Sequence, residues 1–227
     1  MIPAYNEEKR ILKTLEEYYS FFKKEFKGDF EIIVIPNNCN DKTLETVKNF
    51  SKNRKNIRTF NIPYYVGKGG AVMKGFELAN GNFIGFIDAD NSTDSENFFK
   101  LYKNIGDFDG IIASRKIKGA IINPPRRFSQ NVSSFIFNKF VRILFNLRYY
   151  DTQCGAKLFS REVAKFLVKN VSEKGWAFDV DILNLCKKNN FKIKEHPIFW
   201  RDSEGSKLTI VDSLNSVIKL IKYRIKN

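Results

Sequence analysis

The sequence predicts a single α/β domain, with a Rossmann-like, mostly parallel sheet flanked by helices, and three observations lead to this fold class. Short apolar runs with the length of buried strands alternate with segments of helical periodicity. The loops between them carry glycine, asparagine and aspartate, which are turn and helix-capping residues. At 227 residues the chain is long enough for one substantial core, and no linker or low-complexity stretch divides it.

In the first half, strands and helices follow one another in regular order. A very short strand and turn come first, and the next segment has helical spacing with Glu7 and Glu8 in its first turn, where the helix dipole favours carboxylates. A glycine-rich turn at 66–71 opens the third helix. The predicted helices are 7–26, 42–52, 66–80 and 95–104, and the further predicted strands are 31–35, 57–62, 83–87 and 110–114. This order is typical of a parallel, doubly wound sheet.

The second half contains two unusual helical segments. Residues 129–147 are apolar around most of the helix, which is therefore either well buried or in contact with lipid. Residues 210–226 have an apolar face opposite lysine and arginine, which fits either a helix docked on the core or one lying on anionic headgroups. Between these segments we predict strands at 155–159 and 191–199 and helices at 161–169 and 179–188.

Composition limits the classes of function. The formal net charge of +14 fits nucleic acid, anionic lipid or phosphorylated substrates as partners. No known nucleic-acid motif is present and the aromatic residues lie in apolar runs, so we expect no nucleic-acid partner. Cys39, Cys154 and Cys186 are too widely spaced for a disulfide framework or a zinc site and fit a reducing compartment. The sequence shows neither a signal peptide nor an apolar run of about 18 residues that would span a membrane.

Two aspartates mark the predicted chemical centre. The apolar strand 83–87 ends abruptly at Asp88 and Asp90. Ligands of open α/β sheets bind beyond the carboxyl ends of the strands. Carboxylate oxygens there suit Mg²⁺ or Mn²⁺, which keeps several waters and binds the phosphates of a substrate. Taken alone, the pattern fits equally well a turn whose aspartate caps the next helix.

A series of short motifs runs in order along nearly the whole chain. The motifs are residues 3–8, 67–71, 88–90, 114–115, 151–159, 176–179 and 205–208. None is specific alone, but their order and spacing resemble family 2 glycosyltransferases, most closely those that transfer glucose or mannose to dolichyl phosphate. The resemblance implies a GT-A fold and an inverting transfer of one sugar from a nucleotide sugar to a polyprenyl phosphate.

The resemblance also implies a donor site with a divalent cation, Mg²⁺ or Mn²⁺. Asp90 would hold the metal and Asp88 would share it or lie beside the ribose, with Ser92 as a lesser candidate ligand. Metal charge would stabilise the departing nucleotide. The donor-binding residues implied are Pro3, Ala4, Tyr5, Glu7, Asn37, Lys68, Asp88, Ala89, Asp90, Arg201 and Lys207.

The other donor residues have distinct expected roles. Pro3, Ala4, Tyr5 and Glu7 match the nucleoside-binding loop, and the ring of Tyr5 offers a flat face for the base. Lys68 would be a fixed cation, although its glycines do not form a Walker A pattern. Arg201 and Lys207 lie in the late basic loop that closes over the donor phosphates in the family.

The acceptor side is expected to bind an anionic lipid head. A phosphate monoester has a second pKa of about 6, so it needs positioning more than a general base. Guanidinium groups match phosphate oxygens, and the candidates for this role are Ser114, Arg115, Arg126 and Arg127. Asp179 matches the acidic residue that the family places near the acceptor, and an N-cap of the following helix is its rival interpretation; Asp181 is less favoured. The catalytic candidates are Asp88, Asp90, Arg115 and Asp179.

Two departures from the family pattern lead to further expectations. Pro36-Asn37 stands where relatives carry paired aspartates, and an amide complements uracil better than guanine, so we predict a UDP-sugar over a GDP-sugar. The sequence begins almost inside the first motif. Either the start codon is misassigned, or surface helices supply membrane contact in place of an amino-terminal membrane helix.

The sequence therefore predicts one domain with a nucleotide-sugar half (1–115), an acceptor half (116–208) and an amphipathic helix (209–227). We expect a peripheral protein on the cytoplasmic face of a membrane, with an anionic membrane surface as partner. The favoured reaction is transfer of glucose from UDP-glucose to dolichyl or polyprenyl phosphate. The alternatives are a mannose or N-acetylglucosamine donor, a glycan acceptor, and a non-catalytic membrane-associated sugar-nucleotide binder; the oligomeric state is left open.

Overall fold

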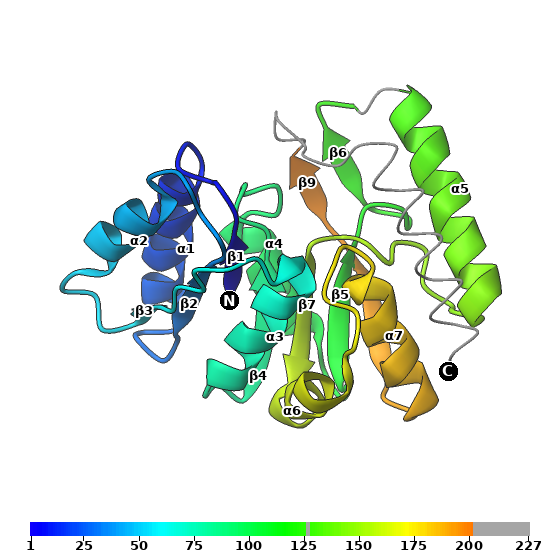
Figure 1. Ribbon diagram of the computed structural model, residues 1–227. Helices are drawn as coiled ribbons and strands as arrows, with labels where there is room; N and C mark the ends of the chain where they lie inside the picture. Colours follow the sequence, from blue (N-terminus) through cyan, green and yellow to red (C-terminus); the bar gives the residue numbers. More distant parts are fainter. Residues whose placement is uncertain (126–127, 202–227) are drawn as a thin grey trace.

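The computed structural model describes residues 1–125 and 128–201, and the side chains of 128–133 are left aside. Two layers of helices enclose a sheet that runs through the centre of the molecule (Figure 1). The predicted sites Arg126, Arg127 and Lys207 and the predicted helix 210–226 lie outside the described residues.

The central layer is built from strands of both halves of the chain. The first sheet has the order β1-β2-β3, with β1 (Ile2–Ala4), β2 (Ile32–Pro36) and β3 (Ile57–Thr59) all parallel. The second has the order β4-β7-β5-β8, with β4 (Phe83–Ile87), β7 (Ala156–Ser160), β5 (Gly110–Ser114) and β8 (Ile193–Pro197). Met1 joins the sheets, since its amino group donates to the Gly85 carbonyl (2.6 Å) and its carbonyl accepts from the Ile87 N–H (3.1 Å).

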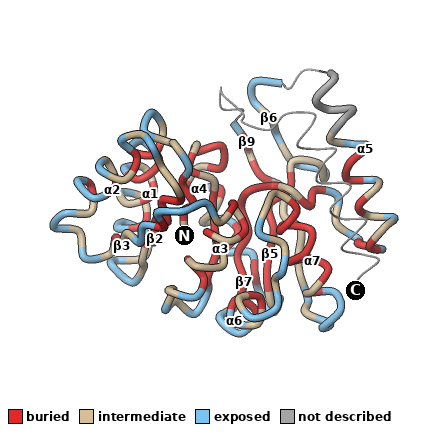
Figure 2. The backbone as a smooth tube through the Cα atoms, viewed as in Figure 1, coloured by how far each residue is buried: buried red, intermediate tan, exposed pale blue. Residues whose placement is uncertain are grey.

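Helices cover both faces of this layer. The helices are α1 (Ile11–Glu25), α2 (Thr43–Ser51), α3 (Gly67–Leu78), α4 (Ser95–Asn104), α5 (Phe128–Phe145), α6 (Arg161–Asn170) and α7 (Phe178–Lys188). Apolar residues of α1, α2 and α4 pack with Val34, Ile87 and Ile111 on one face. Those of α3, α6 and α7 pack with Phe86 and Phe159 on the other. Burial is therefore greatest in the strands between the layers (Figure 2).

Local sequence explains where several helices begin. In α1, Ile11, Leu15 and Tyr18 recur at helical spacing and are buried on one side. Asp94 caps α4 by accepting from the Asn97 N–H (2.9 Å), and Ser160 caps α6 by accepting from the Val163 N–H (3.3 Å). The predicted bounds 83–87, 95–104 and 110–114 are confirmed.

Other predicted elements need correction. The first helix begins at Ile11, because the N–H groups of Arg10 and Ile11 both donate to the Glu7 carbonyl and close a turn before it. The strand predicted at 57–62 ends at Thr59, followed by an isolated bridge between Ile62 and Asn37.

The predicted strand 191–199 is two strands. The chain leaves the main sheet after β8, and β9 (Phe199–Arg201) pairs in parallel with β6 (Ile121–Asn123), a strand that the sequence analysis did not predict. The sheet is also less uniform than a doubly wound parallel sheet, since β7 runs antiparallel to both β4 and β5. The broader prediction of a mostly parallel sheet holds.

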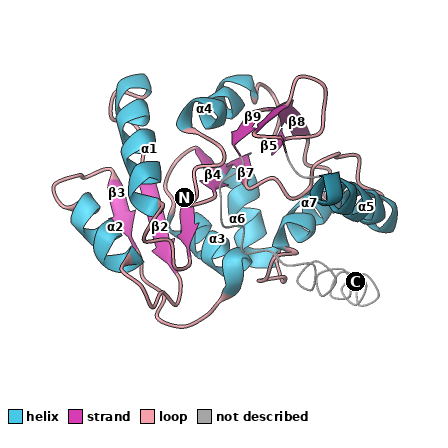
Figure 3. Cartoon of the chain, turned by 90° about the horizontal axis from the view of Figure 1, so that it is seen from above, coloured by secondary structure: helices cyan, strands magenta, loops and turns pink. Residues whose placement is uncertain are grey.

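Helix α5 lies at the opposite end of the molecule from α1 (Figures 1 and 3). Phe137, Val141 and Phe145 face inward and are buried. Phe135, Ile136 and Ile143 are more than half exposed, at 63%, 61% and 73%. The helix is therefore buried along one face and open along another. In the part of the chain that the structure describes, no helix combines the length and apolar character needed to cross a membrane.

Candidate active site

The loops that carry the predicted site residues meet at one edge of the sheet. Strands β1, β2, β4 and β5 run in the same direction, so the loops after them lie at their shared carboxyl edge. Because β7 is antiparallel, its beginning at Ala156 lies at this edge as well. Sites in open α/β sheets form at such edges.

Loops 4–8 and 37–43 are tied together on the donor side. The Glu7 N–H donates to the Thr43 hydroxyl (2.7 Å), and the Asn40 N–H donates to the Asn6 side-chain oxygen (2.8 Å). The half-exposed ring of Tyr5 meets Tyr65 edge to face, with centroids 6.0 Å apart. The expected nucleoside loop thus presents an aromatic surface at the site edge.

The amide of Asn37 is directed at the chain itself. Its oxygen accepts from the Val66 N–H (3.0 Å), its nitrogen donates to the Gly67 carbonyl (3.3 Å), and only 3% of the residue is exposed. The side chain holds the start of α3 against the end of β2. A preference for uracil therefore cannot be argued from this amide alone.

Asp88 is paired with Lys68 at the end of β4. The Lys68 ammonium lies 2.6 Å from Asp88 Oδ1. Burial alone would lower the pKa of Lys68, but the carboxylates of Asp88 and Asp179 raise it above its ordinary value. Lys68 enters from the first turn of α3, so its ammonium lies at the end of β4.

Gly155 makes room for the Asp88 carboxylate. A Cβ added to this glycine would lie 1.9 Å from Asp88 Oδ2, a distance at which atoms overlap. The absence of a side chain at Gly155, in the predicted motif 151–159, therefore leaves the space that the Asp88 carboxylate occupies.

Helix α1 braces the loop that contains Asp90. The Thr14 hydroxyl donates to the Ala89 carbonyl (2.8 Å), the Tyr18 hydroxyl donates to the Thr93 carbonyl (2.7 Å), and the Glu17 carboxylate accepts from the Asn91 amide (2.6 Å). Within this loop, Asp90 Oδ1 accepts from the Ser92 N–H (3.0 Å). These contacts fix the direction of the loop after β4. Asp90 Oδ2 lies 3.9 Å from the Arg10 guanidinium.

The two carboxylates fit a divalent cation that is shared with a substrate. The side chains of Asp88 and Asp90 are 34% and 23% exposed, so both reach the open edge of the site. Among the described residues, no group of three or more histidine, cysteine, aspartate or glutamate side chains forms a closed cation cage. Mg²⁺ and Mn²⁺ are commonly held by one or two carboxylates together with water and phosphate oxygens. With Asp88 already paired to Lys68, Asp90 is the main candidate ligand.

Asp179 lies in the first turn of α7 and is buried. Ala177 occupies the N-cap position, so the capping interpretation of Asp179 is wrong. The carboxylate instead accepts from the Lys157 ammonium, with 2.5 Å between Nζ and Oδ1. Asp181 accepts from the N–H groups of Ser172 and Glu173 (2.9 and 3.0 Å) and anchors the loop before α7.

Arg115 is held by a buried carboxylate. Its Nε and Nη2 donate to the two oxygens of Asp151 (2.7 and 2.8 Å), and its backbone N–H donates as well (3.0 Å). Burial would raise the pKa of Asp151, but Arg115 lowers it to about 2. Two of the guanidinium donors and the backbone N–H of Arg115 are therefore occupied within the protein. Ser114, also predicted at the acceptor site, is buried, and its hydroxyl accepts from the Lys116 N–H (3.3 Å).

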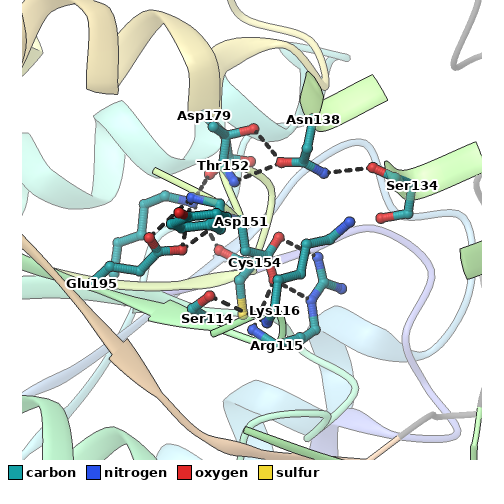
Figure 4. A network of polar contacts seen from close by, with 12 residues as sticks. Ser114, Arg115, Lys116, Ser134, Asn138, Asp151, Thr152, Cys154, Asp179 and Glu195 are labelled. Atoms are coloured by element: carbon teal, nitrogen blue, oxygen red, sulfur yellow. Dashed lines mark hydrogen bonds and ion pairs between the residues drawn. The ribbon is translucent and has the colours of Figure 1, made fainter. Parts of the chain in front are cut away.

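The same loop connects the site to α5. Asn138 of α5 is buried, and its side-chain oxygen accepts from both the N–H and the hydroxyl of Thr152 (3.0 and 3.1 Å). Thr152 follows Asp151, so neighbouring residues reach α5 and Arg115 (Figure 4). Glu195 accepts from the Asp151 N–H (2.8 Å) on the β8 side.

Arg201 reaches the loop after β4 from β9. Its N–H donates to the Ser92 carbonyl (2.8 Å), and its guanidinium lies 3.7 Å from the Asp94 carboxylate. The side chain is half exposed and lies beside the loop that follows Asp90.

The sequence analysis missed several residues of the site. Asp151 and Lys157 were predicted only as parts of the motif 151–159, and Asn138 only as part of the helical segment 129–147. A charged residue inside the apolar strand at 155–159 was the available signal, because such a residue is almost never fully buried without a partner. Nothing in the sequence identified Asp179 as that partner.

Known proteins resemble this chain along most of its length. Residues 1–167 match the model of the family described as glycosyl transferase family 2. A dolichyl-phosphate beta-glucosyltransferase of Dictyostelium discoideum is 34% identical over 236 residues, which cover 98% of this chain and 71% of that protein.

Two solved structures resemble the fold. One is glucosyl-3-phosphoglycerate synthase from Mycobacterium tuberculosis in complex with Mn²⁺ and UDP-glucose, with a TM-score of 0.67, 16% identity, and coverage of 98% of this chain and 77% of that one. The other is the mannosyltransferase PcManGT from Pyrobaculum calidifontis in complex with GDP-Man and Mn²⁺, with a TM-score of 0.65, 15% identity, and coverage of 100% and 63%. At this identity the likeness supports the fold alone.

Proposed function

Because this chain belongs to glycosyl transferase family 2, we propose that it transfers glucose from UDP-glucose to dolichyl or another polyprenyl phosphate at a membrane surface. The predicted family, the GT-A fold and the assignment to the glycosyltransferase enzymes are confirmed by the comparisons. The observation that carries the proposal is the acidic end of β4, where Asp88 lies beside Lys68 and next to Asp90.

The donor is proposed to lie across the loops after β1, β2 and β4. Tyr5 and the loop 4–8 would contact the nucleoside, while Lys68 and Arg201 would face the diphosphate. UDP-glucose is favoured because the relatives are named as glucosyltransferases and a solved neighbour holds that donor. GDP-mannose is the second candidate, since another neighbour of the same fold holds it.

A divalent cation at Asp90 would neutralise charge on the departing nucleotide. The chain's own residues hold this carboxylate in place, through the Ser92 N–H and the contacts of α1 with the loop. Lys68 would add a second positive charge beside Asp88. The developing negative charge therefore meets preorganised cations at one edge of the sheet.

The acceptor needs no residue to remove a proton. A phosphate monoester is ionised near neutral pH, and one of its oxygens forms the new bond to the sugar C1 as the bond from C1 to the nucleotide breaks. The products are UDP and the glycosyl phospholipid. Attack from the side opposite the nucleotide inverts the anomeric centre. Ser114 and Arg115 are the described candidates for positioning the phosphate, with Asp151 setting the orientation of the guanidinium.

Membrane contact is proposed through α5. Its exposed side carries Phe135, Ile136 and Ile143, with Lys139 on the same face. Apolar side chains together with lysine are suited to the boundary between headgroups and acyl chains. The net charge of +14 would favour an anionic surface.

The direct test uses purified protein, Mg²⁺, radiolabelled UDP-glucose and a polyprenyl phosphate, with label counted in the organic phase. We expect transfer by the wild type and a loss of at least about 10²-fold for Asp90→Asn, because a charge-stabilising group is removed. Asp107→Asn makes the same chemical change in an exposed loop and should retain full transfer.

The same assay separates the donor and acceptor alternatives. Faster transfer from GDP-mannose or UDP-N-acetylglucosamine would replace glucose as the proposed sugar. Absence of label in the organic phase with every nucleotide sugar would remove the lipid acceptor and leave a glycan acceptor or a non-catalytic sugar-nucleotide binder. Calorimetric binding of GDP equal to or tighter than that of UDP would contradict the uridine preference.

A further inference from the structure

Lys157 carries its charge in the middle of the protein. It lies in β7, in register with Phe86 of β4 and Ile112 of β5, and its side chain is fully buried. Its Nζ is 5.4 Å from the centre of the Phe86 ring, which belongs to the apolar layer beneath α3, α6 and α7. An ammonium group in such surroundings is costly unless it is paired and hydrogen-bonded.

Both partners of Lys157 belong to the edge of the site. Its ammonium donates to Asp179 Oδ1 (2.5 Å) and to the Cys154 carbonyl (2.8 Å). Cys154 precedes Gly155, the glycine that makes room for Asp88. Among the described residues, Lys157 is the one that hydrogen-bonds to the Asp179 carboxylate. The lysine thus links α7 to the start of β7 at the site.

The charged side chains at this edge of the sheet form pairs of opposite sign. The Asp179 carboxylate is joined through Lys157 to the Cys154 carbonyl, and the neighbouring Gly155 lies against Asp88, so Asp179 and Asp88 lie at the same edge of the sheet. The proposed substrates are a nucleoside diphosphate sugar and a phosphate, which three uncompensated carboxylates would repel. Lys68 balances Asp88, Lys157 balances Asp179, and Arg10 lies 3.9 Å from Asp90, the main candidate ligand of the cation.

Stability alone does not account for the pair. Replacing a buried ion pair by apolar side chains of similar volume is often neutral or stabilising, whereas removal of one partner is strongly destabilising. A lysine and an aspartate placed here cost desolvation that an apolar pair would not. Their position at the same edge of the sheet as Asp88 and Lys68 points to a role in the sugar transfer.

We propose that Lys157 is a positioning residue for the transfer: it fixes the Asp179 carboxylate in one orientation and cancels its charge, so that Asp179 can orient the sugar or acceptor without repelling phosphates. This inference rests on the proposed function and deepens it. Lys157 acts through Asp179 and touches no substrate.

The test is a double-mutant cycle of Lys157→Met, Asp179→Asn and the combined variant, each measured for transfer, for UDP binding and for thermal unfolding. Each single variant should lose about 10²-fold in kcat, since a misplaced group costs that much, while the Kd for UDP stays unchanged. The combined variant should recover thermal stability, because no unpaired charge remains, but its kcat should stay as low as in the single variants. Lys194→Met makes the same change on β8, where the amine contacts the Asn104 carbonyl, and should retain wild-type kcat.

Distinct outcomes would overturn the proposal. If the combined variant regained turnover together with stability, the pair would be merely structural. If the losses of the single variants multiplied, Lys157 would act independently of Asp179. A folded Lys157→Met variant with wild-type kcat would show that the lysine has no role in the transfer. A wild type that transfers no sugar would overturn the proposed function itself, and this inference with it.

Discussion

The ion pair of Arg115 and Asp151 places two charges where water is almost absent. The Asp151 side chain is fully buried, and that of Arg115 is only 10% exposed. Asp151 meets the guanidinium with both oxygens and receives a backbone N–H as well. A pair of this kind fixes geometry more than it adds stability, but the loss of one partner is costly. The orientation of Arg115 at the proposed acceptor site therefore depends on Asp151.

Replacing Asp151 by asparagine should destabilise the protein by about 3–5 kcal/mol, because the Arg115 charge would remain buried and unpaired. The free energy of unfolding in urea measures this change. Glu96→Gln is the matched control, since Glu96 pairs with Lys100 at an exposed site on α4, where such pairs are worth about 0.3–0.5 kcal/mol. Equal effects of the two substitutions would contradict the assignment of Asp151.

The same carboxyl group should make stability depend on pH in acid. The folded-state pKa of Asp151 is lowered from 3.8 to about 2, so its contribution is complete above pH 3.8 and is lost as the pH falls towards 2. The expected loss from this group is about 2 kcal/mol. Urea unfolding between pH 5 and pH 2 should therefore show a shallower pH dependence for Asp151→Asn than for the wild type. Parallel curves would show that another group is responsible.

At the residue scale, the sequence allowed the positions of Asp88, Asp90 and Lys68 at one edge of the sheet to be predicted, but not the pairs that orient the neighbouring side chains. Asp88, Asp90 and Lys68 follow strand ends or open a helix, so their position could be inferred from the order of elements. The pairing of Lys157 with Asp179 joins residues 22 positions apart through the packing of α7 on β7. Asn37 follows β2 at the same edge, and its amide is engaged by the backbone of Val66 and Gly67.

Helix α5 joins two environments. Its inward face packs against the core, its outward face carries exposed apolar side chains, and Asn138 on the inward side holds the loop that contains Asp151 and Thr152. A helix that contacts lipid would thereby be connected to the residues that orient Arg115. The connection between α5 and this loop depends on the Asn138 side chain, whose oxygen accepts two hydrogen bonds from Thr152.

Asn138→Ala should raise the KM for polyprenyl phosphate, because the loop that contains Asp151 and Thr152 loses its hydrogen bonds to α5. The Kd for UDP should stay unchanged, because the substitution does not touch the loops after β1, β2 and β4. The unpaired Thr152 donors should also cost about 1–3 kcal/mol of stability. Lys139→Ala, on the exposed side of the same helix, is the control for stability. If the KM for polyprenyl phosphate and the Kd for UDP rose equally, Asn138 would have no specific connection to the acceptor site.

At the element scale, most helices and buried strands could be predicted, because hydrophobic periodicity and turn residues act locally. The misplaced start of α1 arose because Glu7 is favourable in a helix but here accepts two N–H groups in a turn. The strand β6 is three residues long and half open, so it leaves no pattern in the sequence. The antiparallel direction of β7 depends on contacts with distant strands, which a local pattern does not contain.

The molecule as a whole has two different ends. The outward face of α5 carries the exposed side chains of Phe135, Ile136 and Ile143, and the helix lies at the opposite end of the molecule from α1 and α2 (Figure 1). We expect the protein to sediment with vesicles that contain anionic phospholipid, and binding to weaken as ionic strength rises.

The combined substitution Ile136→Glu and Ile143→Glu should reduce vesicle binding at least about tenfold, since burial of each isoleucine is worth roughly 1.5–3 kcal/mol. Leu12→Glu places the same charge on α1, at the other end of the molecule, and should bind as the wild type does. Equal binding of all variants would remove α5 as the contact surface.

The strand β7 has a consequence for how the protein is made. It comes from residues 156–160, yet it lies between β4 and β5, which a ribosome completes far earlier. Until residue 160 has left the exit tunnel, β4 and β5 lack the strand that pairs with both of them. During this time the nascent polypeptide exposes apolar side chains of these strands. Translation speed over the stretch between β5 and β7 should therefore influence the yield of native enzyme more than translation speed elsewhere in the message.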